Sequence, residues 1–204
     1  KMPVVVIVVY RILPQLLILF VFVMIIQHTI GSMRDDAYRI AELTYRKEVD
    51  SATRLYNKNK YEDMLANYYT MVERVAVVLW DINNLKEIND RMGHGMGDKL
   101  IETMSGAIYA QTDSRKKAYR IGGDEFVMLI ENPEKQEAEQ IIQNVRDKLA
   151  RHREEGGLRV SSATGTAEGN GIDILKIVHH ADERMYEDKK RGKESHEYAM
   201  FYSE

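Results

Sequence analysis

The sequence predicts an α/β fold in which helices flank a central, mostly antiparallel sheet, preceded by an N-terminal transmembrane helix. Strand-like and amphipathic segments alternate from about residue 50 onward, which is typical of helices packed on a sheet. Residues 121–127 read Ile-Gly-Gly-Asp-Glu-Phe-Val, which indicates a β-hairpin with a glycine tip. Residues 2–30 carry a single charged side chain, Arg11, whereas the rest of the chain is rich in charged residues.

Length and composition restrict the classes of protein to be considered. The 204 residues suit one domain of ordinary size with an appendage. A formal net charge of −3 leaves no broad basic field, so we expect no nucleic acid partner. The absence of cysteine excludes disulfides and thiolate metal sites. Because the first residue is a lysine, we expect the natural N-terminus to lie further upstream.

We expect the transmembrane helix over residues 12–31. Residues 16–26 are apolar without interruption, and about 20 residues cross the hydrocarbon core of a bilayer. Pro14 would lie in the first turn of this helix, where proline is tolerated. Two alternatives stay open, a single helix over residues 2–26 that buries Arg11 at a cost in lipid, and a hydrophobic core element of a soluble protein.

The segments on either side of this helix have different characters. The β-branched run at residues 4–9 favours a strand, so residues 1–11 would end a truncated extracytoplasmic segment. Residues 32–49 are charged and rich in helix formers, which predicts a signalling helix before a domain at residues 50–204. Heptad-like spacing is too short here to establish a coiled coil, and a solvated connecting helix is the alternative; the spaced residues are Ala37, Ile40, Thr44 and Lys47.

The domain shows alternating helix and strand patterns. We expect Pro133 in the first turn of a long amphipathic helix, which Gly156-Gly157 would end. The segment at residues 198–202 would close the fold. The expected helices are residues 52–70, 84–91, 98–111, 134–153 and 172–190, and the expected strands are residues 74–81, 117–121, 125–131 and 158–167.

The hairpin tip combines small residues with acids. Gly122 and Gly123 would supply the positive φ angles of a tight turn and would leave room for a phosphate. Asp124 and Glu125 would stand at the rim of the sheet, where carboxylates can hold a divalent cation. A tight turn with solvated acids is the alternative for this motif taken alone.

Four further motifs accompany this hairpin in a fixed order. They are Asp50-Ser-Ala-Thr-Arg-Leu-Tyr-Asn57, Asp81-Ile-Asn-Asn-Leu-Lys86 with Asn89-Asp90, Gly93-His-Gly-Met-Gly-Asp98, and Ala181-Asp-Glu-Arg-Met-Tyr186 with Lys189, Gly192 and Lys193. With the hairpin, these motifs resemble those of the GGDEF family of diguanylate cyclases over about residues 48–203. The resemblance implies a palm-like α/β sandwich similar to that of nucleotidyl cyclases.

Two carboxylates are expected to form a metal site. Asp81 ends a buried strand, and Asp124 comes from the hairpin that should pair beside that strand. Carboxylates and phosphate oxygens suit Mg²⁺ (or Mn²⁺). The resemblance adds the carbonyl oxygen of Ile82 as a ligand, and Glu125 as a second metal ligand or as a group that helps to remove a proton, so Asp124 and Glu125 are the expected catalytic residues. Asp81 as the N-cap of the next helix is the alternative.

The resemblance also implies residues that bind GTP. The turn at Asn84, Leu85 and Lys86 opens a helix whose free N–H groups could cradle a triphosphate, although Lys86 alone reads as a solvated lysine. Asn89 and Asp98 match the guanine-reading pair of the family, and an N-cap is the alternative role for Asp98. The remaining expected substrate contacts are Gly122 and Gly123 at the turn and Lys189 and Lys193 on the phosphates. We assign His94 no catalytic role.

The activity that the resemblance implies is condensation of two GTP molecules into cyclic di-GMP with release of pyrophosphate. Each domain would hold one GTP, so a homodimer is expected, anchored in the inner membrane with its catalytic domain in the cytoplasm, where GTP is available. The alternative function is a catalytically silent GGDEF domain that senses GTP or binds a protein. A relative of adenylyl cyclases or polymerases is disfavoured because Asn89 occurs together with Asp98.

One feature of the family is missing. The product-inhibition site usually carries Arg-x-x-Asp, with its arginine nine residues before the first glycine of the signature. Residues 113–116 read Asp-Ser-Arg-Lys instead. We therefore expect weak or absent inhibition by cyclic di-GMP through that site.

Overall fold

The computed structural model describes the backbone of residue 4 and of residues 8–201, and most side chains in that range except those of residues 193–201 and a few before residue 47. The chain forms two compact units, Lys1–Lys47 and Glu48–Glu204. Each unit is described separately.

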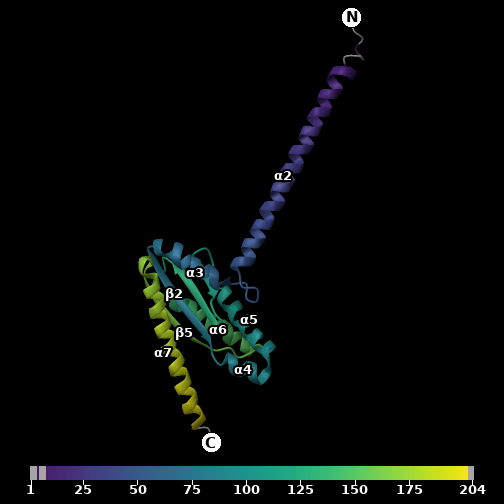
Figure 1. Cartoon of the computed structure of the whole chain (residues 1–204). Coiled ribbons are helices and arrows are strands. Elements are labelled where there is room, and N and C mark those ends of the chain that lie inside the picture. Colours follow the sequence, from purple (N-terminus) through teal and green to yellow (C-terminus); the bar gives the residue numbers. More distant parts are fainter. Residues whose placement is uncertain (1–3, 5–7, 202–204) are drawn as a thin grey trace. The chain divides into compact units, whose positions relative to one another are not determined.

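The N-terminal unit is helical. A π-helical turn, η1 (Val8–Ile12), leads into the 36-residue helix α2 (Leu13–Glu48) (Figure 1). The strand predicted over residues 4–9 is therefore wrong at residues 8 and 9, and residues 5–7 lie outside the described residues. Pro14 lies in the first turn of α2 as predicted, since the missing N–H has no intrahelical partner there.

Helix α2 covers both the predicted transmembrane segment and the predicted signalling helix without interruption. Its large apolar side chains are exposed in this unit, with exposed fractions from 40% at Val23 to 69% at Ile18 between residues 13 and 30. Among the described residues, one helical stretch is long and apolar enough to cross a membrane, Leu13–Ile40, which contains an 18-residue window with a mean hydropathy of 2.1.

The second unit contains a mixed five-stranded sheet in the order β1-β3-β4-β2-β5. Strand β1 pairs with β3 in parallel, and every other pairing is antiparallel, so the prediction of a mostly antiparallel sheet is confirmed. The strands are β1 (Tyr56–Asn57), β2 (Arg74–Ile82), β3 (Lys116–Arg120), β4 (Glu125–Glu131) and β5 (Ser162–Asn170). Strand β5 begins four residues later than predicted and extends three residues further.

The helix predicted over residues 52–70 is shorter, because a turn and strand β1 precede it. Asp50 closes that turn by accepting hydrogen bonds from the backbone N–H (2.9 Å) and the hydroxyl (2.7 Å) of Thr53. Asn57 then caps the helix by accepting from the N–H of Lys60 at 3.0 Å. The helices of this unit are α3 (Lys58–Asn67), α4 (Leu85–Met92), α5 (His94–Tyr109), α6 (Glu137–Glu154) and α7 (Ile174–Phe201), with 3₁₀ turns η2 (Tyr69–Met71) and η3 (Gly171–Asp173).

Three helix boundaries differ from the predictions. Helix α5 begins at His94, after an N-cap at Gly93 with φ of 83°, and not at residue 98. Helix α6 begins after Gln136, whose φ of 63° turns the chain, so Pro133 precedes the helix and is not part of it. Helix α7 runs to Phe201, so the separate closing segment predicted at residues 198–202 is wrong for the residues described. The predicted end of α6 is confirmed, because Gly156 follows the C-cap with φ of 85°.

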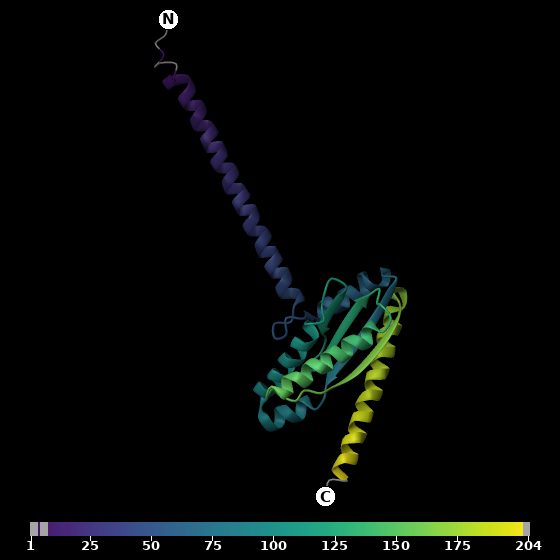
Figure 2. The ribbon, with the colours of Figure 1, turned by 180° about the vertical axis from the view of Figure 1, so that it is seen from behind.

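The core lies on both faces of the sheet. Strand β2 sends Trp80 and Ile82 toward α4, α5 and α6, and it sends Val77 and Leu79 toward α3 and α7. Figures 1 and 2 show α7 along one face and α6 along the other. Because side chains alternate along a strand, Asp81 belongs to the α7 face.

Candidate nucleotide and metal site

The acids of the hairpin lie beside Asp81 because of the register of two strands. Strand β2 pairs with β4 so that Asp81 is opposite Glu125. The N–H of Ile82 donates to the carbonyl oxygen of Asp124 at 3.0 Å. The prediction that the hairpin pairs beside the strand of Asp81 is therefore confirmed.

The Gly122-Gly123 turn is held by the side chain of Arg120. Its guanidinium donates to the carbonyl oxygens of Gly122 (3.1 Å) and Gly123 (2.8 Å) and to a carboxylate oxygen of Asp50 (3.3 Å). Neither glycine has a positive φ, so the expectation that the pair supplies positive φ angles is wrong. A Cβ on Gly122 would lie 2.5 Å from Oε2 of Glu125, so this glycine makes room for the acid that follows it.

Asp81 is buried and paired with Lys189. Asp81 is 6% exposed, and Nζ of Lys189 lies 2.7 Å from each of its carboxylate oxygens. This contact brings helix α7 to the end of strand β2. The structure thus brings the ammonium of Lys189 onto a carboxylate of the expected metal site, while its predicted contact with a phosphate stays a prediction.

The site carries more negative than positive charge. Burial raises the pKa of Glu125, and the charges of Asp124, Asp81 and Asp182 raise it further, while Lys189 opposes the shift. Oxygen donors with an excess of negative charge suit a divalent cation such as Mg²⁺. Among the described residues, however, no group of three Asp, Glu, His or Cys side chains lies close enough to hold a metal ion. The donor atoms are therefore of the kind that Mg²⁺ binds, but these side chains do not converge on one point, and Asp81 is paired with Lys189.

A helix begins at the turn where a phosphate cradle is expected, as predicted. Asn84, in a left-handed conformation with φ of 59°, precedes the first residue of α4, and its side chain makes no capping hydrogen bond. Asp81 lies on β2 and does not cap this helix, so that alternative is wrong. Leu85 packs in the core while Lys86 is exposed. The N–H of Asn83 donates to the carbonyl of Ser161 at 2.9 Å, which fixes the loop to the chain entering β5.

Asn89 contains the one buried side-chain polar atom without a hydrogen-bond partner among the described residues. This atom is Oδ1, and its amide lies against Gly97, where a Cβ would come within 2.0 Å of Oδ1. Asp98, the other member of the expected guanine-reading pair, is exposed within α5. The N-cap role for Asp98 is therefore wrong. An unpaired buried oxygen costs free energy, which a ligand donor or water would recover.

Residues that were not predicted from the sequence also organise this site, and the side chain of one predicted residue is not described. The side chain of Lys193 lies outside the described part of α7. Arg120 and Asp50 were not expected to hold the turn, although Asp50 opened a recognised motif. Gly165 was also missed: a Cβ there would lie 2.0 Å from the carbonyl oxygen of Ala181 in α7. A glycine inside a strand pattern is a signal of close backbone approach and could have indicated it.

The fold and the site define an α/β domain with a glycine-tipped acidic hairpin beside a buried aspartate. The chain belongs to the GGDEF family: residues 47–195 match the family model described as diguanylate cyclase, GGDEF domain.

Characterised relatives carry this domain within longer proteins. Diguanylate cyclase DosC of Escherichia coli is 26% identical over 183 residues, which cover 84% of this chain and 40% of DosC. Diguanylate cyclase DgcS of Shewanella oneidensis is 26% identical over 163 residues, covering 78% of this chain and 55% of DgcS. Cyclic di-GMP phosphodiesterase PdeR of Escherichia coli is 32% identical over 150 residues, covering 71% of this chain and 23% of PdeR.

Solved structures share the fold. The coiled coil and GGDEF domain of DgcB from Caulobacter crescentus, in complex with c-di-GMP, superposes with a TM-score of 0.70 at 19% identity, covering 84% of this chain and 95% of that one. A fragment of TpbB (YfiN) from Pseudomonas aeruginosa that comprises only the GGDEF domain gives a TM-score of 0.58 at 28% identity, covering 70% and 89%. These likenesses confirm the predicted fold class.

Proposed function

We propose that this chain is a magnesium-dependent diguanylate cyclase that condenses two GTP molecules into cyclic di-GMP and releases pyrophosphate. The observation that carries the proposal is the strand register that sets Asp81 opposite Glu125, with Asp124 bonded to the adjacent Ile82. The family membership and the cyclase relatives support the same activity.

Four groups would hold the metal, namely the side chains of Asp81, Asp124 and Glu125 and the carbonyl oxygen of Ile82. A bound Mg²⁺ or Mn²⁺ ion lowers the pKa of an attacking hydroxyl and stabilises a leaving pyrophosphate. Glu125 suits the acceptance of a proton, because its raised pKa brings it closer to the working pH than an ordinary glutamate.

The remaining residues would bind and orient GTP. The N–H groups at the start of α4, next to Asn84, Leu85 and Lys86, would bind the phosphates together with Lys189 and Lys193, and the bare backbone of the Gly122-Gly123 turn lets a phosphate approach. The unpaired Oδ1 of Asn89 would accept a hydrogen bond from guanine, whose N1–H and N2–H₂ groups are donors, and Asp98 would accept another. Adenine would leave these acceptors unpaired.

The reaction joins two nucleotides, so two domains must face each other. The 3′-oxygen of one GTP forms a bond to the α-phosphorus of the other, the bond to pyrophosphate breaks, and the same step is repeated to close the ring. We propose a homodimer in the inner membrane. The N-terminal part of helix α2 would be the anchor, its C-terminal part the linker, and the catalytic domain would lie in the cytoplasm. The exposed apolar surface of α2 supports this anchor.

The test is to incubate the detergent-solubilised chain with GTP and Mg²⁺ and to measure cyclic di-GMP. Asp124→Ala should reduce the rate by at least about 100-fold, while Glu139→Ala, which removes an exposed carboxylate on α6, should leave it unchanged. A dimeric preparation that binds GTP without forming product would contradict the cyclase proposal.

That outcome would instead support a catalytically silent module. The contact of Lys189 with both oxygens of Asp81 is the observation in favour of that second candidate, because it neutralises an expected metal ligand. GTP binding that does not depend on Mg²⁺ would agree with it.

We also propose that the product does not inhibit this chain through the family's usual site. Arg115 is bonded to a carboxylate oxygen of Glu137 at 3.2 Å and to the carbonyl oxygen of Glu131 at 3.2 Å, and Lys116 bonds to Asp113. These basic groups therefore serve the fold. Strong non-competitive inhibition by added cyclic di-GMP would contradict this proposal.

A further inference from the structure

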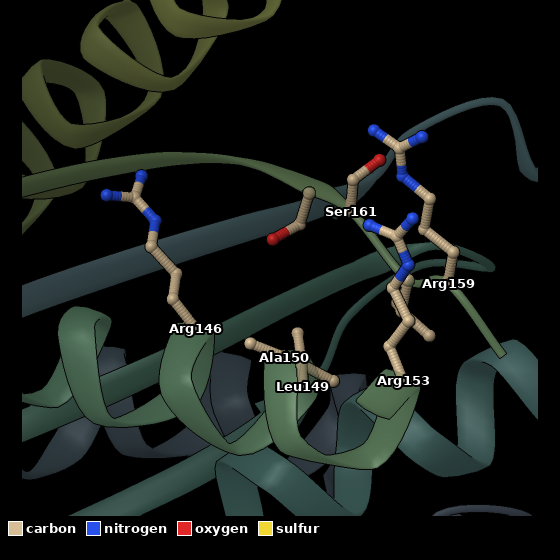
Figure 3. Close-up of a pocket in the computed structure, with 8 residues that line it drawn as sticks. Arg146, Leu149, Ala150, Arg153, Arg159 and Ser161 are labelled. Atoms are coloured by element: carbon tan, nitrogen blue, oxygen red, sulfur yellow. The ribbon is translucent and has the colours of Figure 1, made fainter. Parts of the chain in front are cut away.

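A pocket lies between the C-terminal half of α6 and the segment that enters β5 (Figure 3). Its volume is about 260 Å³. The apolar side of the pocket is formed by Leu149, Ala150 and Val160, and the polar side by Arg146, Arg153, Arg159, Ser161 and Ser162.

The helix spacing gathers the arginines around this pocket. Arg146 and Arg153 are seven residues apart on α6, which places them on one face about 10.5 Å from each other along the axis. Leu149 and Ala150 lie between them on the same face. Figure 3 shows Arg146 at one end, Arg153 and Arg159 at the other, and the guanidinium groups of all three projecting to the same side as Ser161.

These guanidinium groups are unpaired among the described residues. Within the described part of the chain, none of Arg146, Arg153 and Arg159 makes a hydrogen bond or an ion pair, whereas Arg74 and Arg120 each pair with a carboxylate. Like charges gathered around a small cavity repel one another, and a bound anion would remove that cost. The planar fork of arginine matches phosphate oxygens, and serine hydroxyls add donors.

The pocket is separate from the nucleotide site. Ser162 pairs with Ile82, whose side chain packs in the core on the α6 face, whereas Asp81 contacts Lys189 of α7 on the other face. The loop before α4 connects the two sites, because the side-chain amide of Asn83 donates to the hydroxyl of Ser161 at 3.4 Å.

We propose that this arginine pocket, lined by Arg146, Arg153 and Arg159, binds a diphosphate group. The group is either inorganic pyrophosphate or the phosphate end of a nucleotide. The volume of about 260 Å³ is below the roughly 300–1,000 Å³ of sites that enclose a drug-sized ligand, so the pocket takes a phosphate head and leaves the rest of a larger ligand outside. Because the formal net charge of the chain is −3, the attraction for anions is local to this pocket, and the charge argues against a basic surface large enough for a polymeric anion.

The experiment is isothermal titration of the full chain in detergent with inorganic pyrophosphate, without divalent metal. Arg159→Gln and Arg153→Gln should each raise the dissociation constant of the pocket about tenfold, since each removes a charge-assisted hydrogen bond. Arg151→Gln is the matched control, because Arg151 is an exposed arginine of α6 that does not line the pocket, and it should change nothing. The thermal unfolding midpoint of each variant shows whether it is folded.

The outcomes separate this proposal from the proposed cyclase activity. A second pyrophosphate site that GTP displaces and Arg159→Gln leaves intact would be the nucleotide site. The cyclase proposal is tested separately, by formation of cyclic di-GMP from GTP with Mg²⁺, so either proposal can fail while the other stands. Equal pyrophosphate binding by Arg159→Gln and the unaltered chain would overturn the arginine pocket, as would an equal loss in Arg151→Gln. Titration with GDP identifies the source: tighter binding than inorganic pyrophosphate at the Arg159-dependent site indicates a nucleotide, and equal or weaker binding indicates a free inorganic anion.

Discussion

Substitution of Gly165 by alanine tests how helix α7 is held on the sheet. A Cβ at this position of β5 would lie 2.0 Å from the carbonyl oxygen of Ala181 and 2.4 Å from the backbone nitrogen of Met185. Both atoms belong to the backbone of α7, so a side-chain rotation cannot relieve the contact and the helix must move outward. Lys189 lies one turn beyond Met185, so the displacement would also pull its ammonium away from Asp81.

The expected loss of stability follows from these distances. Overpacking of a core typically costs about 1–3 kcal/mol and more when backbone must shift, while replacing a strand glycine returns about 0.5–1 kcal/mol. We therefore expect Gly165→Ala to lower the free energy of unfolding by about 2–3 kcal/mol. Gly169→Ala in the same strand is the control: its Cβ would lie 3.1 Å from Cδ1 of Ile177, a side-chain atom that can move, so its effect should stay within about 1 kcal/mol.

The assay is urea unfolding followed by the fluorescence of Trp80. This residue is the single tryptophan of the chain and is 1% exposed, so its emission reports the core of the sheet. A free energy of unfolding for Gly165→Ala within about 1 kcal/mol of the unaltered chain would refute the reasoning, as would an equal loss for Gly169→Ala.

Three further substitutions test other parts of the site. Arg120→Gln, which removes the bonds that hold the Gly122-Gly123 turn, should lower the free energy of unfolding by about 2–3 kcal/mol in the same urea assay; an unchanged midpoint would contradict this. Arg54→Gly should raise the free energy of unfolding by about 0.5–1 kcal/mol, because Arg54 has a φ of 62° that glycine adopts without strain; a lower free energy of unfolding would contradict this expectation. Glu125→Gln should raise the thermal midpoint in metal-free buffer at pH 7–8, since the raised pKa means that ionisation of Glu125 destabilises the folded state once the pH exceeds the unfolded value near 4.5. The gain should vanish below that pH, and a gain independent of pH would contradict the cause.

Regular patterns made most of the fold predictable. Strand β2 is apolar from Val75 to Trp80, and the glycine pair marks the turn between β3 and β4, so the central strands were predicted within one residue. Helix α5 was misplaced because Gly93, Gly95 and Gly97 favour a loop by propensity. In the structure Gly97 packs on Asn89, and that tertiary contact overrides the local preference. Strand β1 has two residues, which is too short for a periodic signal.

The candidate site was predictable where a motif carries its residues, and not where hydrogen bonds between side chains and distant parts of the chain hold it together. Asp81, Asp124 and Glu125 could be named from their motifs. The role of Arg120 could not, because its three partners are two carbonyl oxygens and a carboxylate that lies 70 residues earlier in the chain. The alternation of charges along a sequence also does not show which cation pairs with which anion.

The pairing of Lys189 with Asp81 links the charge of the site to the order of events in the proposed reaction. A buried carboxylate without a counter-charge is costly, so the ammonium stabilises Asp81 while no other cation is near. A divalent cation held by Asp81 would supply that charge instead, and the ammonium would then be free to bind a phosphate of GTP. Charge balance then favours binding of the metal together with the nucleotide, because the metal alone would displace a cation from Asp81 without giving Lys189 a new partner.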